Sequence, residues 1–401
     1  MTNTALKFGL VGLGGFATGA CKALLAREPR RPFQLTHVYD PEPQNFPGLV
    51  AELQAHHVTL CPSYEAFLAT PIQALWLPVP IDLHRPYTEQ ALRAGKAVLC
   101  EKPAAGCVQD VDAMIAARDG AKLPVAIGFQ DIYTDSTFAI KTRLLAGAID
   151  TPRSATLVAC WPRDENYYAR PWAAKLQRNG TWLLDSPANN ALAHFINLAM
   201  FFLGETMANV ATPVAVEAEL YRANAIENYD TCSIRIHVAG GVPLTINLTH
   251  ACQNTHHPII TLVGERGTFT YDGNNGTASF GSETLALTNN GYENTLRGFE
   301  RHLFEPASPR PYASLEMARA HSLVISAANQ IAPVRTIGAE HIQIHRNSGR
   351  GLHAIPGIEE AFRKATAAGQ MLHESKLLPW TRPGRRIEVT QYNQFTGPAQ
   401  E

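Results

Sequence analysis

A glycine-rich turn near the N-terminus constrains the fold of this chain more than any other feature. The largely apolar run Leu6–Val11 leads directly into Gly12-Leu13-Gly14-Gly15-Phe16-Ala17, and a helix-like stretch follows. This spacing matches the G-x-G-x-x-G/A pattern that joins a strand to a helix in dinucleotide-binding sheets. Gly12 permits the sharp turn, Gly14 lets a pyrophosphate approach the backbone, and Ala17 allows helix and strand to pack closely. The turn therefore predicts a dinucleotide-binding domain.

Two further signals complete the predicted nucleotide site. The helix that begins at Gly15 and Phe16 would hold the phosphates on its free N–H groups. A second strand-like run, Phe33–Tyr39, ends in Asp40, where an acidic residue would hold a ribose 2′-OH. Residues 41–44 supply a further carboxylate and no Arg, Lys or Ser to receive a 2′-phosphate. We therefore predict NAD rather than NADP as the cofactor.

The order of the predicted elements indicates an α/β chain with two domains. A chain of 401 residues is longer than one ordinary domain. Over residues 1–130, short β-rich runs alternate with helical patterns, which is typical of a doubly wound parallel sheet. The strands expected there are Leu6–Val11, Phe33–Tyr39, Ala74–Leu77, Ala97–Cys100 and Val125–Gly128. We therefore predict a Rossmann domain over residues 1–130.

Residues 131–385 predict a second, α+β domain. Longer alternating runs indicate a large, mainly antiparallel open sheet. Its expected strands are Ser154–Trp161, Val214–Tyr221, Thr231–Val238, Pro243–Thr249 and Pro258–Val263. The helices expected in the whole chain are one capped by Ser63, one with Pro86 in its first turn that stops at Gly95, Ser136–Leu145, Pro187–Leu203, Ser314–Gln330 and Ile358–Glu374. Residues 386–401 predict a tail with little structure, and we expect the active site in the cleft between the domains.

Composition excludes several function classes. The net charge of −1 gives no reason to expect nucleic acid or an anionic membrane surface as a partner. No apolar run reaches the roughly 20 residues of a membrane span, and no secretory signal precedes the first strand. The seven cysteines contain no C-x-x-C pair, and the fifteen histidines lack the spacing of a metal site. These features predict a cytoplasmic protein without a bound metal.

A short motif after the run Ala97–Cys100 carries the first chemistry. Glu101-Lys102-Pro103 would lie at the carboxyl end of a parallel strand, where ligands bind in such sheets. By itself the tripeptide is an ordinary surface turn. With the upstream series Leu75-Trp76-Leu77-Pro78-Val79-Pro80, His84 and Ala91-Leu92…Ala94-Gly95-Lys96, it resembles the glucose–fructose oxidoreductase/inositol dehydrogenase (Gfo/Idh/MocA) family.

The resemblance implies roles for the residues of this block. Lys102 takes the place of the family's catalytic lysine, and Glu101 keeps that lysine in position. Val79, Pro80, His84 and Gln130 would line the cofactor. Val79 stands where the family usually has Thr, and Ile81 stands where it commonly has Asn. An ammonium close to a reacting hydroxyl would stabilise the alkoxide character that develops as hydride leaves carbon.

A second constellation lies around the predicted helix Pro187–Leu203. On a regular helix, Asn190, His194 and Asn197 would share one face. One interpretation is that His194 bonds a neighbouring carbonyl in the core. The family resemblance instead makes His194 the base. The ordinary histidine pKa, about 6.5, suits proton transfer at neutral pH. It leaves open whether Asp185 or Asn190 occupies the position of the family's catalytic-site Asp.

A third cluster, residues 161–175, combines four aromatic rings with three cations. Aromatic faces and guanidinium groups suit a polyhydroxylated or carboxylated ring, although such a loop could also pack on its own side chains. The family resemblance places this region in the substrate pocket, and we expect Arg163, Tyr168, Trp172, Lys175 and, from the helix, Asn190 to contact substrate.

The resemblance implies an NAD-dependent dehydrogenase or reductase acting on CH–OH groups. Hydride would pass between nicotinamide and a secondary alcohol of a sugar, cyclitol or sugar derivative, with Lys102, His194 and Asp185 as the catalytic residues. Two alternatives stay open. One is a glycosidase or lyase that uses NAD for transient oxidation and elimination, and the other is a non-catalytic dinucleotide or sugar sensor. We expect a small carbohydrate-like substrate and a homodimer or homotetramer formed through the second domain's sheet.

Overall fold

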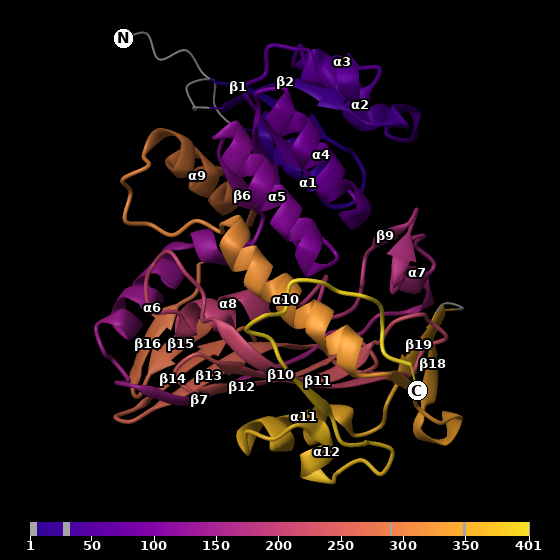
Figure 1. Ribbon diagram of the computed structural model, residues 1–401. Helices are drawn as coiled ribbons and strands as arrows, with labels where there is room; N and C mark the ends of the chain where they lie inside the picture. Colours follow the sequence, from indigo (N-terminus) through magenta and orange to yellow (C-terminus); the bar gives the residue numbers. More distant parts are fainter. Residues whose placement is uncertain (1–5, 27–32, 289–290, 348–349, 401) are drawn as a thin grey trace. The chain divides into compact units, whose positions relative to one another are not determined.

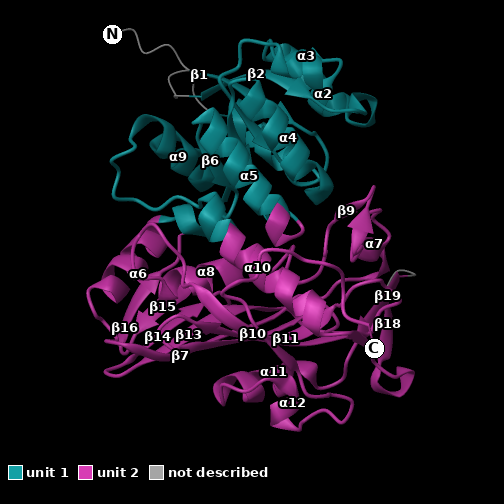
Figure 2. Ribbon diagram, in the orientation of Figure 1, with its two compact units in different colours: residues 1–105, 110–134, 289–318 teal, residues 106–109, 135–288, 319–401 magenta. Residues whose placement is uncertain are grey.

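The computed structural model describes residues 6–26, 33–288, 291–347 and 350–400 (Figure 1). They fall into two compact units. Unit 1 comprises residues 1–105, 110–134 and 289–318, and unit 2 comprises residues 106–109, 135–288 and 319–401 (Figure 2).

Unit 1 is built on a six-stranded parallel sheet with the strand order β3-β2-β1-β4-β5-β6. Its strands are β1 (Leu6–Val11), β2 (Phe33–Tyr39), β3 (Thr59–Cys61), β4 (Ala74–Leu77), β5 (Ala97–Cys100) and β6 (Val125–Ile127). The order reverses between β1 and β4, which is the switch point where ligands bind in doubly wound sheets. The predicted Rossmann sheet is confirmed, and the apolar runs marked five of its six strands to within one residue. The short strand β3 was not predicted.

The helices of unit 1 confirm one predicted cap and correct one predicted start. They are α1 (Phe16–Leu25), η1 (Pro43–Asn45), α2 (Pro47–Ala55), α3 (Tyr64–Leu68), α4 (Ile81–Arg93), α5 (Val108–Ala121, which starts in unit 2), η2 (Gln130–Tyr133) and α9 (Gly291–Phe304). The Ser63 hydroxyl caps α3 by accepting from the Ala66 N–H at 3.1 Å. The prediction that Pro86 opens α4 was wrong, because the helix begins five residues earlier, directly after Pro80. Pro86 lies inside the helix, where it lacks the N–H for a bond to the Asp82 carbonyl.

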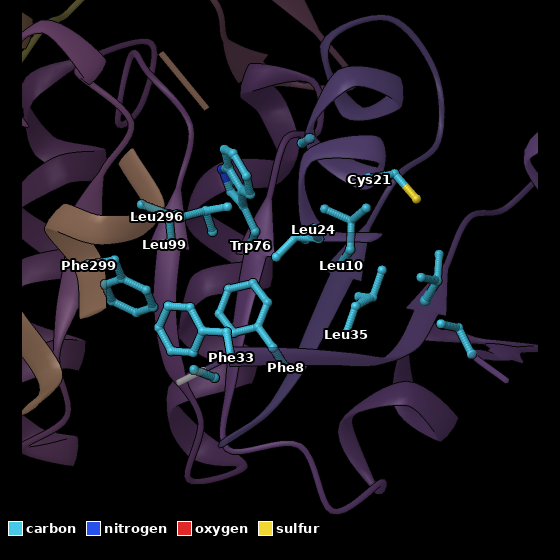
Figure 3. Packing of buried hydrophobic residues seen from close by; sticks show 14 of the residues in the cluster. Phe8, Leu10, Cys21, Leu24, Phe33, Leu35, Trp76, Leu99, Leu296 and Phe299 are labelled. Atoms are coloured by element: carbon cyan, nitrogen blue, oxygen red, sulfur yellow. The ribbon is translucent and has the colours of Figure 1, made fainter. Parts of the chain in front are cut away.

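Helix α9 returns the chain to unit 1, although the expected domain boundaries placed it in the second domain. Leu296 and Phe299 of α9 are fully buried in the same apolar cluster as Phe8 and Phe33 (Figure 3). The Phe8 and Phe33 rings stack at 4.5 Å, and Phe299 packs 5.9 Å from Phe33. Periodicity reveals the apolar face of such a helix but not the sheet on which that face will pack.

Unit 2 contains a ten-stranded mixed sheet. Its main path runs β16-β15-β14-β13-β7-β12-β11-β10-β17, and β20 also pairs with β10. The strands are β7 (Pro152–Cys160), β10 (Pro213–Arg222), β11 (Thr231–Val238), β12 (Pro243–Thr249), β13 (His256–Gly264), β14 (Thr268–Asp272), β15 (Thr277–Phe280), β16 (Glu283–Ala286), β17 (Val334–Thr336) and β20 (Arg385–Glu388). Among the described strands of this unit 2 sheet, only the β7–β12 and β10–β17 pairs are parallel. The predicted large, mainly antiparallel sheet is confirmed.

Helices cover both faces of this sheet (Figure 1). Helix α8 (Ala193–Leu203) packs on β7, β12 and β13, on the side of α6 (Asp135–Leu145) and of α10 (Leu315–Ile331). On the opposite face, α11 (Ile358–Ala367) and α12 (Leu372–Ser375) cover polar positions of the strands. The Asn247 amide donates to the Thr366 hydroxyl at 3.0 Å, and the Leu372 N–H donates to the Ser233 hydroxyl at 3.1 Å.

Three predictions for unit 2 were wrong. The helix expected from Pro187 begins at Ala193, because the Leu192 N–H bonds the Pro187 carbonyl in a wider turn. The helix expected over residues 358–374 divides into α11 and α12 near Gly369, where φ is +66°. The tail is structured because β20 pairs with the free edge of β10, and Phe395 is only 2% exposed.

Two short hairpins complete unit 2: β8 (Gln177–Arg178) with β9 (Thr181–Trp182), and β18 (Gln343–Asn347) with β19 (Arg350–Ala354). The remaining short helices are α7 (Glu165–Tyr168) and η3 (Ala339–His341). Across the described parts of both units, no helix is long and apolar enough to cross a membrane. Those parts also contain no group of three or more His, Cys, Asp or Glu side chains that could hold a metal ion.

Candidate active site

The glycine turn of unit 1 has the geometry of a pyrophosphate site. Gly12 and Gly15 have φ of +97° and +59°, a region that residues with a Cβ rarely enter. The backbone N–H groups of Gly14, Gly15 and Phe16 donate to no acceptor among the described residues. Because they lie at the start of α1, they are available to phosphate oxygens.

Close packing explains the composition of this turn. A Cβ on Gly12 would lie 3.2 Å from the Pro78 carbonyl oxygen, and one on Gly14 would lie 3.0 Å from the Phe46 ring. Ala17 is fully buried. Phe16 is 40% exposed, and its ring lies 4.7 Å from that of Tyr292 in α9. The turn is therefore held from three sides, and larger residues would displace it.

Asp40 connects the end of β2 to the glycine turn. Its Oδ2 accepts from the Leu13 N–H at 2.7 Å, and its Oδ1 accepts from the Glu42 N–H at 2.8 Å. Each carboxylate oxygen keeps a further lone pair for a ribose hydroxyl. The residues of this edge therefore fit a dinucleotide, with Asp40 on the ribose and the turn on the pyrophosphate.

Glu101 lies directly beyond β5 in a buried position. Its Oε1 accepts from the Trp76 indole N–H at 3.1 Å, and its Oε2 accepts from the Lys102 N–H at 3.2 Å. A Cβ on Gly128 would collide with this carboxyl at 2.4 Å, so the neighbouring strand end must carry glycine. Burial raises the pKa of Glu101 to about 7, and the Lys102 ammonium opposes that shift.

Two further titratable groups face Lys102. Burial raises the pKa of Asp131 to about 6, while the positive charge of Lys102 acts to lower it. The ring nitrogens of His84 lie 2.7 and 2.9 Å from the carbonyl oxygens of Pro103 and Val79. Burial lowers the pKa of His84, the two carbonyls oppose that change, and Lys102 contributes to it. The positive charge of Lys102 therefore acts on both Glu101 and Asp131 at the end of the sheet.

The other predicted cofactor residues are placed around this strand end. Val79 and Pro80 connect β4 to α4, with Pro80 directly before the first helical residue. The Gln130 amide packs directly against Gly291. A Cβ added to Gly291 would lie only 2.2 Å from Gln130 Oε1. Asp131 was not among the predicted residues, although it follows the apolar strand β6 as Lys102 follows β5. Trp76 gave no such signal, since it lies within a strand.

In unit 2, the structure brings the two candidates for the catalytic-site Asp together. The Asn190 amide donates to Asp185 Oδ1 at 2.7 Å, and the Ala174 N–H donates to Oδ2 at 2.5 Å. Asp185 is 1% exposed, and its backbone carbonyl accepts from the Asn228 amide at 3.0 Å. Asp185 and Asn190 therefore form one carboxylate–amide pair.

His194 lies in the first turn of α8 and is half-buried. Asn197, one turn further, is fully buried. Because regular helix starts at Ala193, Asn190 lies in the preceding turn, and the predicted three-residue helix face was wrong. The Ser186 hydroxyl caps that turn, accepting from the Asn189 N–H at 3.2 Å. Lys102 and His194 belong to different units.

The aromatic–cationic cluster is stacked within itself. The Arg163 guanidinium lies 5.8 Å from the Trp161 ring centre and 5.1 Å from that of Tyr167. Arg170 lies 4.9 Å from the Tyr167 ring centre and 5.5 Å from that of Trp172. These cation–π contacts fix two of the positive charges over flat apolar surface.

The remaining predicted substrate residues differ in exposure. Lys175 forms an ion pair with Glu227 at 2.5 Å, with both side chains more than 40% exposed. Burial raises the pKa of Tyr168 well above its ordinary value, and the carboxylates of Asp230 and Asp185 act in the same direction. Tyr168 therefore remains a phenol at neutral pH and can donate to a substrate oxygen.

Tyr167 and His250 were missed from the sequence. The Tyr167 ring lies 5.9 Å from the ring of His250, whose Nδ1 is 2.7 Å from the Trp161 carbonyl oxygen. Burial and the neighbouring Arg163 lower the pKa of His250 to about 3, so its imidazole is neutral. The signal for Tyr167 was its place in the aromatic run, whereas His250 follows β12 without a motif.

Two protein-family models match this chain. A family model described as "Oxidoreductase family, NAD-binding Rossmann fold" matches residues 6–129. A second model, "GFO/IDH/MocA C-terminal domain", matches residues 138–270.

Individual relatives are distant. An inositol 2-dehydrogenase from Rhizobium meliloti is 25% identical over 262 residues, which cover 65% of this chain and 74% of that protein. Another from Burkholderia cenocepacia is 26% identical over 55% of this chain and 59% of that protein. The solved WlbA dehydrogenase from Bordetella pertussis, in complex with NADH and UDP-GlcNAcA, is 22% identical, with a TM-score of 0.67 over 81% of this chain and 95% of that chain.

Proposed function

The chain belongs to the Gfo/Idh/MocA family of NAD-binding oxidoreductases, and from this premise we propose that it oxidises or reduces a carbon–oxygen bond of a sugar, cyclitol or sugar derivative. The observation that carries the proposal is the charge arrangement at the end of β5. There, Lys102 follows the buried Glu101, its positive charge acts on the carboxyl groups of both Glu101 and Asp131, and the same sheet carries the open N–H groups of the glycine turn.

The residues of unit 1 divide the work between binding and polarisation. Bound NAD supplies the nicotinamide carbon that accepts or donates hydride. The glycine turn holds the pyrophosphate, and Asp40 binds the ribose. Lys102 donates a hydrogen bond to the reacting oxygen, and Glu101 keeps the ammonium in place. A charge aimed in advance at the oxygen where charge develops lowers the barrier without reorganisation.

In unit 2, His194 takes the hydroxyl proton during alcohol oxidation and returns it during reduction. The buried Asp185 carboxylate fixes the Asn190 side chain, and Asn190 contacts substrate hydroxyl groups. Arg163, Tyr168, Trp172 and Lys175 complete the proposed substrate contacts. The sugar or cyclitol class is supported by the relatives, which include inositol 2-dehydrogenases and a dTDP-3,4-didehydro-2,6-dideoxy-alpha-D-glucose 3-reductase from Streptomyces violaceoruber, 34% identical over 92 residues that cover 23% of this chain and 27% of that protein.

The proposal is tested by incubating the purified protein with NAD and a panel of polyols, cyclitols, aldoses and glycosides while following the absorbance of NADH. We expect stoichiometric NADH formation with at least one secondary alcohol. If substrate is consumed with cleavage of a glycosidic bond and without net NADH, the enzyme is a glycosidase or lyase. If the protein binds NAD and sugar but converts neither, it is a sensor.

Assembly and location belong to the same proposal. We expect a homodimer or homotetramer formed through the sheet of unit 2. Helix α11 packs on β7 and β12, whereas Val263 on β13 remains 41% exposed. Light scattering of the wild type and of Val263→Glu tests this face, because a charge there should shift the protein toward monomer. A cytoplasmic location is supported by the seven cysteines, which are all buried and free.

A further inference from the structure

We propose that the substrate carries an anionic group, a carboxylate or a phosphate, and that Arg163, Arg170 and Arg350 bind it. This inference rests on the proposed function and narrows its substrate class. The three arginines line one pocket of about 630 Å³ in unit 2, a volume typical of small-molecule sites.

The protein neutralises only part of the positive charge that the three arginines bring to this pocket. Among the described residues that line it, Asp164 is the one carboxylate. Its Oδ1 already accepts from the Tyr167 N–H at 3.2 Å, which caps α7. Neither Arg170 nor Arg350 forms an ion pair within the described parts of the chain, and the buried Nε of Arg163 has no hydrogen-bond partner there. Three cations around one hollow repel each other unless an anion lies among them.

The donors of these arginines are oriented before any ligand binds. The guanidinium groups of Arg163 and Arg170 both lie over the Tyr167 ring, at 5.1 and 4.9 Å from its centre. Planar guanidinium groups fixed in this way match the two oxygens of a carboxylate or the oxygens of a phosphate. A neutral sugar would leave most of these donors without a charged acceptor.

Arg350 reaches the pocket because the hairpin β18–β19 is fastened to α7. The Glu165 carboxylate accepts from the Gly351 N–H at 3.0 Å, and a Cβ on Gly351 would lie 2.3 Å from Glu165 Oε1. The Asn166 amide, with its oxygen toward Arg350, accepts from Nε at 2.8 Å and from an Nη at 3.2 Å. Position 351, next to Arg350, therefore requires glycine.

The pocket also adjoins the candidate substrate site within unit 2. Tyr167 lines the pocket and contacts the ring of His250, and the carboxylate of Asp185 contributes to raising the pKa of Tyr167, after burial. An anionic substituent held by the arginines would therefore place the rest of a sugar toward the Asp185–Asn190 pair. Arg350, which the hairpin brings to this pocket, would thus help to select an anionic substrate.

The test compares the binding of three probes that share one ring: D-glucose, D-glucuronate and D-glucose 6-phosphate. Dissociation constants are measured by calorimetry with NAD present, at constant ionic strength and without turnover. We expect at least one charged probe to bind about tenfold more tightly than glucose, because hydrogen bonds to charged groups are the stronger ones. Preference for glucuronate assigns a carboxylate, and preference for glucose 6-phosphate assigns a phosphate.

Two variants attribute this preference to the pocket. Arg350→Gln and Arg170→Gln should each reduce the charged-to-neutral ratio about fivefold or more and leave NAD affinity unchanged. Arg266→Gln is the matched control, since Arg266 is 83% exposed and pairs with Asp150 at 2.8 Å outside the pocket. Equal binding of charged and neutral probes, or a preference that survives both pocket variants, would overturn the inference. If charged probes bind but no alcohol reduces NAD, the proposed oxidoreductase function fails while the anion pocket stands.

Discussion

The glycine turn of unit 1 and the aromatic–cationic loop of unit 2 organise ligand groups in opposite ways. The turn uses backbone N–H groups, and a side-chain contact joins Asp40 to its Leu13 N–H, 27 residues apart. The loop uses side chains, and it is completed by a contact between Glu165 and Gly351, which are 186 residues apart. A common cofactor can be held by local backbone geometry, whereas a particular substrate is recognised by side chains from several segments.

This difference predicts where single substitutions act. In unit 1, substitutions at Lys102 and Asp40 should change the chemistry or the cofactor choice without moving the turn. In unit 2, substitutions should change substrate affinity and proton transfer. Each prediction below separates these two kinds of effect.

The largest effect is expected for Lys102→Met. Removing the ammonium takes away the charge that stabilises the developing alkoxide, which costs roughly 10²–10³ in kcat. The affinity for NAD, measured by fluorescence titration, should change little, because the turn and Asp40 are untouched. Lys122→Met, at an exposed lysine directly after α5, is the control. Near-normal turnover, or a loss of NAD binding together with turnover, would show that Lys102 is not the polarising group.

A pH profile distinguishes the two candidate proton acceptors of unit 2. If His194 takes the hydroxyl proton, kcat for alcohol oxidation rises with pH through the neutral range, because only neutral imidazole accepts a proton. His194→Asn should flatten that limb and lower kcat roughly 10²-fold. Asp185→Asn should keep the limb and mainly raise KM, since Asp185 is bonded to Asn190 and the Ala174 N–H. The opposite pattern would assign proton transfer to Asp185.

The sequence predicted the two regions unequally. The glycine turn, Asp40 and the Glu101–Lys102 pair follow apolar strands, so local pattern was enough to locate them. The start of α8 was misplaced because Ser186 and Pro187 open a wide turn rather than a regular helix. Helix α9 and Arg350 could not be assigned to their sites, since hydrophobic periodicity does not specify which distant segment a face will meet.

The pKa of Glu101 gives a stability test of unit 1. Its folded-state pKa of about 7 lies above the ordinary value of 4.5, so the native state binds the proton more tightly between these values. The contribution of this carboxyl to stability is therefore greatest below pH 4.5 and declines as pH rises to 7. Relative to Glu101→Gln, the wild type should lose up to about 3 kcal/mol in free energy of unfolding from pH 4.5 to 8. Urea unfolding of both proteins at both pH values measures this change. If the difference in free energy of unfolding between wild type and variant is the same at pH 4.5 and pH 8, Glu101 is not a buried carboxyl with a raised pKa.

The smallest effect is expected at Asp40, where the turn and its side chain can be separated. Asp40→Asn keeps an oxygen for one backbone N–H but removes the charge that favours the ribose hydroxyls and repels a 2′-phosphate. We expect NAD to bind about tenfold more weakly and NADP to bind more tightly, because charge-assisted hydrogen bonds are roughly twice as strong as neutral ones. The N–H groups of Gly14, Gly15 and Phe16 are unchanged, so pyrophosphate binding should persist. Isothermal titration with NAD, NADP and ADP-ribose measures these contributions. If the variant loses all three ligands equally, Asp40 acts by holding the Leu13 and Glu42 backbone in place, and the nucleotide site then depends on a side chain as strongly as the loop of unit 2 does.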